Sequence, residues 1–198
     1  MSSTTPTEVV SKLLKNTLNP EVVRELVAPD ATYVSLNYDN PDLTKILPYA
    51  GSHTKAGPQA IIDTFATVNR IWANEAFEIQ TLFGAGKDVA VFGSFTYRSR
   101  SLGKVSVSPF SIWCKVNEDG KVTYMQFMED TLGSTDSFKK GGQKQYVVFK
   151  EKGEIEVQLN VERGFRHLLN MMGEFRLMWS CTAGIGSNGF RSPEAISP

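Results

Sequence analysis

Apolar side chains in the first part of the chain recur every three or four positions, the spacing of an amphipathic helix. This pattern predicts two short consecutive helices, over residues 6–18 and 20–27. Thr5-Pro6-Thr7-Glu8 has the sequence of a capping box and marks where the first helix begins. A strand over 31–38 and a long loop over 39–57 are expected next.

A third helix is expected to begin at Gly57-Pro58, with an apolar face that includes Ile61, Phe65, Val68 and Trp72. After Trp72 the period of the apolar positions changes from about 3.6 to about 2, the spacing of β-strands. Short glycine-containing turns join these strands, so consecutive strands pair antiparallel. Helices followed by such a meander predict an α+β fold. The four predicted strands cover 76–83, 88–100, 104–117 and 121–130.

The regular pattern weakens after Thr131. Residues 145–150 and 154–159 flank Lys152-Gly153 and predict a terminal hairpin, whereas 161–179 has the spacing of an amphipathic helix. The last residues are expected to be disordered. We therefore expect one domain over residues 5–150 and a C-terminal extension over 151–198.

Charge and composition exclude several function classes. The 198 residues contain 21 Lys and Arg and 21 Asp and Glu, so the net charge is zero, which argues against a nucleic-acid partner and a polybasic membrane patch. No run of 18 apolar residues predicts a membrane span, and the N-terminus lacks a signal-peptide pattern, so a cytoplasmic location is expected. The two Cys and two His have no ligand spacing, and no metal or cofactor is expected.

The order of these elements resembles the cone-shaped fold of the nuclear transport factor two-like superfamily. Within it, the chain is similar to SnoaL-like polyketide cyclases and ketosteroid isomerase-like proteins over about residues 7–145. The resemblance implies a curved antiparallel sheet wrapped round three N-terminal helices, an apolar pocket open at one end, and a homodimer formed through the outer face of the sheet. The segments that carry it are Tyr33-Val34-Ser35-Leu36-Asn37, Gly57-Pro58-Gln59-Ala60-Ile61 and Glu129-Asp130-Thr131.

The last strand of the meander ends in two adjacent carboxylates. Asp130 shares a face with Met128, and Glu129 shares the other face with Phe127, so one carboxylate faces the pocket. The resemblance favours Asp130, because SnoaL-like cyclases keep an acid near this point. An apolar pocket raises the pKa of a carboxyl group toward that of a useful general base. The other interpretation is an Asp that accepts backbone N–H bonds from the turn that follows.

Further candidates come from the first strand and the long loop. His53 is expected to polarise a carbonyl group, or else to be a solvated loop residue. Tyr33 and Asn37 are expected to donate to an enolate oxygen, with Tyr38 and Tyr97 as other candidates, and packing is the alternative for each tyrosine. The expected apolar pocket wall consists of Trp72, Phe65, Phe92, Phe110, Trp113 and Met128.

These residues indicate a cofactor-independent isomerase or cyclase that transfers a proton next to the carbonyl group of an apolar cyclic compound. The alternative is a non-catalytic protein that binds a hydrophobic ligand or serves as a dimeric scaffold. Epoxide hydrolysis is disfavoured, because Arg98-Ser99-Arg100 lacks the aspartate of the Arg-x-Asp found in the similar limonene epoxide hydrolases. The superfamily contains enzymes, binding modules and transport factors, so the fold alone leaves this choice open.

Overall fold

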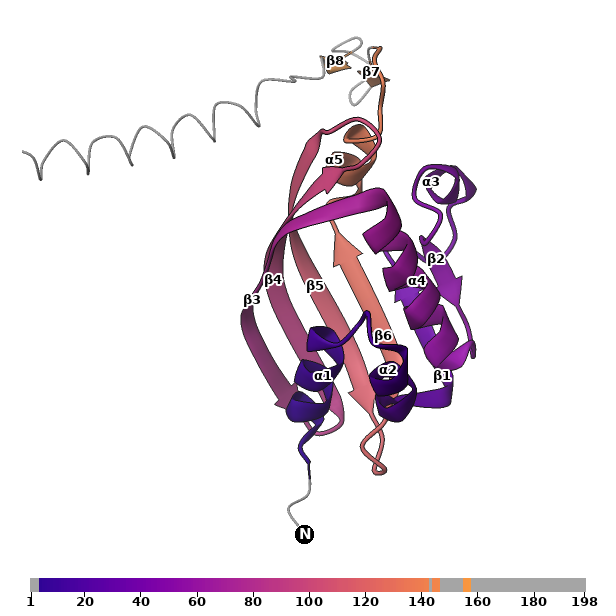
Figure 1. Cartoon of the computed structure of the whole chain (residues 1–198), viewed down its shortest axis with the longest axis vertical. Helices are drawn as coiled ribbons and strands as arrows, with labels where there is room; N and C mark the ends of the chain where they lie inside the picture. Colours follow the sequence, from indigo (N-terminus) through magenta and orange to yellow (C-terminus); the bar gives the residue numbers. More distant parts are fainter. Residues whose placement is uncertain (1–3, 143, 147–154, 158–198) are drawn as a thin grey trace, which may run out of the picture. The chain divides into compact units, whose positions relative to one another are not determined.

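The computed structural model describes residues 4–142, 144–146 and 155–157 (Figure 1). The chain divides into two units, residues 1–141 and 142–198. The elements of the first unit are α1 (Pro6–Lys15), α2 (Pro20–Leu26), β1 (Val27–Ser35), α3 (Pro41–Ile46), β2 (Gly51–His53), α4 (Gly57–Ile71), β3 (Trp72–Ala85), β4 (Asp88–Ser99), β5 (Val105–Val116), β6 (Val122–Glu129) and α5 (Thr131–Asp136).

Six strands form one curved sheet in the order β2-β1-β6-β5-β4-β3. All neighbours pair antiparallel except β1 and β6, which are parallel. In Figure 1 the helices α1, α2 and α4 lie against one face of this sheet, and the apolar core lies between the two layers. The α+β fold expected from the sequence is therefore confirmed, with a curved sheet and helices at the N-terminus.

The first two helices begin where the sequence predicts. Thr5 and Glu8 form the capping box: the Glu8 amide donates to Thr5 Oγ1 at 3.3 Å, and the Thr5 amide donates to Glu8 Oε2 at 2.7 Å. Asn19 caps α2 by accepting from the amides of Glu21 and Val22. Only residues 16–19 separate the two helices, so this short connection is held at both ends.

The stretch 39–57, expected as a loop, contains the short helix α3 and the edge strand β2. Asn40 caps α3 through the Leu43 amide, and Pro41 occupies its first turn. β2 pairs with β1, so Tyr33 lies opposite His53. A six-residue helix and a three-residue strand are too short for a periodic pattern to show them, which explains the difference.

A close approach within the sheet fixes the aromatic core. A Cβ atom on Gly93 of β4 would lie 2.1 Å from the Glu78 carbonyl oxygen and 2.5 Å from the ring of Phe110. Only glycine therefore lets the Phe110 ring lie over this strand. The ring stacks between Phe77 and Phe127, with centroid distances of 4.6 and 5.5 Å.

In the second unit, β7 (Lys144–Tyr146) pairs antiparallel with β8 (Ile155–Val157). These strands fall where a hairpin is predicted. The helix expected over 161–179 and the expected disordered end lie outside the described residues. No helix in the described part of the chain combines the length and the apolar composition that a membrane crossing requires.

Candidate functional site

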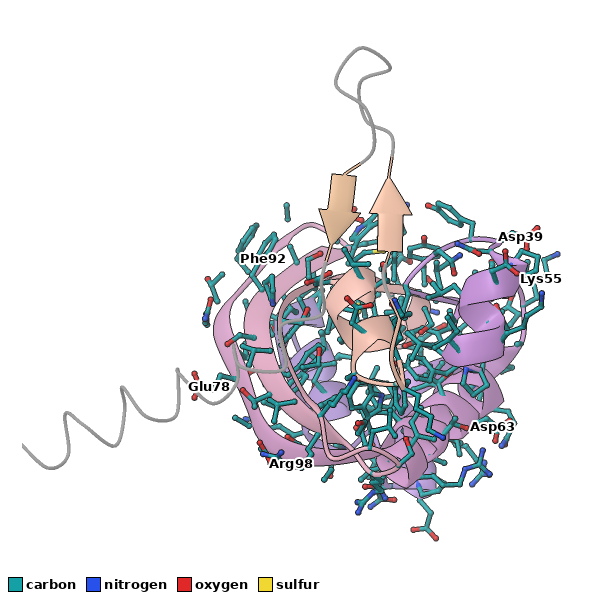
Figure 2. The ribbon with its side chains drawn as sticks, turned by 90° about the horizontal axis from the view of Figure 1, so that it is seen from above. Asp39, Lys55, Asp63, Glu78, Phe92 and Arg98 are labelled. Atoms are coloured by element: carbon teal, nitrogen blue, oxygen red, sulfur yellow. The ribbon has the colours of Figure 1, made fainter. Side chains whose placement is uncertain are left out.

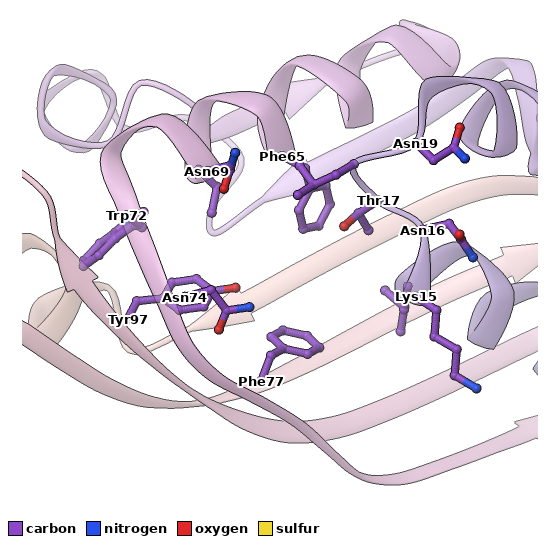
Figure 3. Close-up of a pocket in the computed structure, with 13 residues that line it drawn as sticks. Lys15, Asn16, Thr17, Asn19, Phe65, Asn69, Trp72, Asn74, Phe77 and Tyr97 are labelled. Carbon is purple, nitrogen blue, oxygen red and sulfur yellow. The ribbon is translucent and has the colours of Figure 1, made fainter.

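A pocket of about 450 Å³ opens between the α1–α2 connection, α4 and the start of β3 (Figure 3). Its volume is within the range of small-molecule sites, roughly 300–1,000 Å³. Aromatic rings from α4, β3 and β4 form one part of its wall: Phe65, Trp72, Phe77 and Tyr97. Polar side chains line another part: Lys15, Asn16, Thr17, Asn19, Asn69 and Asn74.

A buried carboxyl group lies at the end of β6. Met125 and Phe127 are buried, and Glu129 follows them on the same inner face of the sheet. Burial raises the pKa of Glu129 to about 7; the Ser134 hydroxyl acts in the opposite direction, and the Asp130 charge raises it further. Glu129 Oε1 is buried and has no hydrogen-bond partner among the described residues. The carboxylate of the inner face is thus Glu129.

Asp130, the predicted base, points elsewhere. Its residue is exposed, and its Oδ1 accepts from the Gly133 amide at 3.0 Å, which makes it the N-cap of α5. Asp130 follows the last residue of β6, and its side chain turns toward the first turn of α5 while Glu129 continues the inner face of the strand. The prediction that Asp130 faces the pocket is therefore wrong, and the alternative interpretation, an Asp that accepts a backbone N–H from the following turn, describes its contacts.

Three tyrosines lie within electrostatic reach of Glu129. Burial raises the pKa values of Tyr33, Tyr49 and Tyr97, that of Tyr97 to about 12, and the negative charge of Glu129 adds to each rise. All three therefore stay protonated at neutral pH and present neutral hydroxyl groups. Trp72 Nε1 donates to the Tyr49 hydroxyl at 3.4 Å. Since Trp72 and Tyr97 also line the pocket, these two side chains connect the pocket with the surroundings of Glu129.

His53 lies on the edge strand and not in a solvated loop. It is half-buried, and its ring stacks on Tyr33 with a centroid distance of 6.0 Å and an interplanar angle of 13°. Its Nε2 is 3.5 Å from the Tyr49 carbonyl oxygen. The structure thus brings together two predicted site residues, His53 and Tyr33, and adds Tyr49 beside them.

Asn37 has a buried side-chain amide whose Oδ1 and Nδ2 lack hydrogen-bond partners among the described residues. The Leu36 amide donates to the Phe127 carbonyl at 2.8 Å, and Leu36 has a left-handed φ of 66°. The chain therefore turns out of the parallel β1–β6 ladder just before the level of Glu129. A buried unpaired amide is costly unless a ligand or water satisfies it. Asn37 thus carries an unengaged side-chain amide two residues beyond the end of β1.

The predicted apolar wall divides into two sets. Phe65 and Trp72 line the pocket, and Phe110 is buried against the lining residue Phe77. The wall prediction is wrong for three residues that alternation places on the outer face, where they are 43%, 42% and 38% exposed: Phe92, Trp113 and Met128. Figure 2 shows Phe92 at the outside of the sheet. Trp113 Nε1 donates there to Asp88 at 2.7 Å.

Sequence reasoning missed Glu129 and Tyr49 as site residues. The alternation Met125, Phe127, Glu129 was a signal for the first, since it continues an apolar face into a carboxyl group. Tyr49 precedes a three-residue strand in an irregular stretch and has no such signal. Among the described residues, no three His, Cys, Asp or Glu side chains gather as a group able to hold a metal ion.

The family of this chain is shown by its sequence similarity to a known protein. No family model matches the chain. Patulin synthesis protein F of Aspergillus clavatus is 46% identical over 135 residues, which are 67% of this chain and 68% of that protein.

Solved structures share the fold. An NTF2-like protein of Burkholderia thailandensis has a TM-score of 0.58 at 19% identity, covering 70% of this chain and 99% of that one. IdmH, a proposed polyketide cyclase of Streptomyces antibioticus, has a TM-score of 0.51 at 14% identity, covering 67% and 97%. The chain therefore belongs to the family of patulin synthesis protein F, and its fold is that of the nuclear transport factor two-like superfamily.

Proposed function

We propose that the protein is a cofactor-independent isomerase or cyclase that transfers a proton next to the carbonyl group of a cyclic small molecule. Glu129, and not Asp130, is the general acid-base group. The observation that carries this proposal is a carboxyl group on the inner face of β6, where burial raises its pKa to about 7. Such a group both accepts and returns a proton near neutral pH.

In this mechanism the Glu129 carboxylate removes a proton from the carbon next to the carbonyl group. The resulting enolate oxygen accepts a hydrogen bond from Asn37 Nδ2, which has no other partner among the described residues. Tyr33 supplies a second neutral hydroxyl, and its stacking on His53 fixes its ring. Protonated Glu129 then returns the proton to a different carbon, which isomerises the compound. In a cyclisation the enolate carbon instead attacks a second carbonyl carbon of the same molecule, and the oxygen of that carbonyl group takes the proton from Glu129 as its π bond breaks.

The comparisons support this class of reaction. The relative in Aspergillus clavatus is named for patulin synthesis, and IdmH is a proposed polyketide cyclase. We extend the first name to this chain only as a substrate class, a cyclic intermediate of a small-molecule biosynthesis. Phe65, Trp72 and Phe110 are proposed to hold and shield the ring of that substrate.

The test uses deuterium exchange at C2 of 1-tetralone, a cyclic ketone, followed by NMR in buffered D₂O. Wild-type protein is expected to accelerate the exchange above the buffer rate, and Glu129→Gln is expected to slow it by about 10²–10⁴-fold. Asp130→Asn is the matched control: Asn caps a helix as well as Asp does, so exchange should change little. Equal acceleration by wild type and Glu129→Gln would refute the assignment of the base.

A non-catalytic ligand carrier is the second candidate, favoured by the position of Glu129 outside the set of residues that line the pocket. In that case 1-tetralone or a related ketone binds to wild type and to Glu129→Gln with similar affinity, and neither protein accelerates exchange. Calorimetric titration alongside the NMR assay separates the two candidates.

We also propose that the protein forms a homodimer through the outer face of the sheet. Large apolar side chains exposed on strands β3 to β6 gather on that face, and the rings of Phe83 and Phe92 stack at 6.2 Å. Exposed apolar patches of this kind mark interaction surfaces. Light scattering of wild type and of Phe92→Glu tests the proposal: the wild type is expected to be dimeric and the variant monomeric, and a monomeric wild type would contradict it.

A further inference from the structure

A β-bulge in β3 places a polar side chain inside the pocket. The register between β3 and β4 pairs Asn74 with Tyr97 and Ala76 with Thr96, so Glu75 is an extra residue on β3. In a regular strand, residues three apart point to opposite faces. Asn74 and Phe77 nevertheless both line the pocket, because the extra residue reverses the alternation between them.

The extra residue itself is turned away from the pocket. Glu75 Oε1 accepts from Arg98 Nε at 2.6 Å, and Figure 2 shows Arg98 at the outside of the sheet. Bulges of this kind redirect a side chain and occur often beside active sites. The specific consequence here is that an amide, and not an apolar side chain, lies beside the Tyr97 ring.

A second amide reaches the same pocket from α4. Asn69 lies in the last turn of that helix, and Figure 3 shows Asn69 and Asn74 near the rings of Trp72 and Tyr97. Neither side chain has a hydrogen-bond partner among the described residues, whereas the two other lining amides are engaged. Asn16 Nδ2 donates to the Lys12 carbonyl at 2.8 Å, and Asn19 Oδ1 caps α2.

We propose that Asn69 and Asn74 form an amide clamp that binds an oxygen substituent of a ring compound. The ring itself packs on Phe65, Phe77 and Tyr97. The only charged side chain among the described lining residues is Lys15, so a cationic ligand finds no counter-charge there. The two amides are neutral hydrogen-bonding groups that suit a hydroxyl or carbonyl oxygen on the ring. This inference rests on the proposed function in one respect, that the ligand is a cyclic ketone.

The test compares the dissociation constants of 1-tetralone and 6-hydroxy-1-tetralone, which differ only in one hydroxyl group at the end opposite the ketone. Calorimetry on the full chain is expected to show about fivefold to tenfold tighter binding of the hydroxylated compound by wild type. Asn74→Leu and Asn69→Leu are each expected to bring that ratio close to one. Gln80→Leu, on the same strand but outside the pocket, is the matched control and keeps the ratio.

Three results would overturn the clamp. In the first, wild type binds the two compounds with equal affinity; in the second, it binds neither; in the third, both Asn→Leu variants keep the wild-type ratio. The ratio of the two dissociation constants does not depend on turnover, so a failure of the clamp can be distinguished from a failure of the proposed function. A preserved ratio without deuterium exchange supports the clamp and rejects the enzyme. Exchange without the ratio supports the enzyme and rejects the clamp.

Discussion

The buried carboxyl group of Glu129 makes a quantitative prediction about stability. A pKa raised from 4.5 to about 7 means that the folded state disfavours the charged form. Below pH 4.5 both states hold the proton and nothing is lost. As pH rises through 4.5 toward 7 the unfolded chain releases its proton first, so the folded state loses stability, by about 3 kcal/mol once pH exceeds 7.

Glu129→Gln removes this titration and is therefore expected to stabilise the protein increasingly with pH. By linkage the gain over wild type is about 1 kcal/mol at pH 5 and about 3 kcal/mol at pH 8, on top of any constant effect of the amide. Urea denaturation of both proteins at the two pH values measures this difference, and Asp130→Asn serves as the control for a carboxyl group that is exposed. If the difference in unfolding free energy between Glu129→Gln and wild type stays constant from pH 5 to 8, the raised pKa of Glu129 is refuted.

Three further predictions concern stability and the site. Gly93→Ala forces a Cβ atom onto the Glu78 carbonyl and the Phe110 ring, so it is expected to lower the free energy of unfolding by about 1–3 kcal/mol. The measurement is the urea midpoint, and an unchanged midpoint would mean that the strands separate easily. Asp130→Ala removes the cap of α5 and is expected to cost about 1 kcal/mol, whereas Asp130→Asn keeps it. Asn37→Leu removes the proposed enolate donor and is expected to slow 1-tetralone exchange about 10²-fold with little change in affinity, so a normal rate would exclude Asn37 from that role.

The sequence predicted the fold well because its elements are long and periodic. The capping box at Thr5 and the four alternating strands of the meander indicated both their type and their pairing. It could not predict which face of each strand is buried, because both faces carry large apolar residues. Phe92 and Phe95 in β4 belong to opposite faces, yet nothing in their residue types distinguishes the outer ring from the inner one.

The same ambiguity explains the exchange of Asp130 for Glu129. Met128 and Phe127 gave both carboxylates an apolar neighbour on their own face, so only packing against the helices decides between them. The bulge at Glu75 was hidden for another reason. It contains no glycine or proline, and its effect on Asn74 depends on the partner strand, which a local pattern does not contain.

Stability and function make opposite demands on Glu129. A protein without a function at this site would gain from an apolar residue at position 129. It would avoid the cost of about 3 kcal/mol that the ionised Glu129 carboxyl group imposes on folding. The buried side-chain amide of Asn37 likewise lacks partners among the described residues, and it follows the β1 residue that pairs near the same end of β6. Folding alone gains nothing from such a group of unsatisfied atoms, whereas a proton-transfer site needs them unengaged. The concentration of these costs at one end of the sheet is therefore the strongest reason to look for chemistry there.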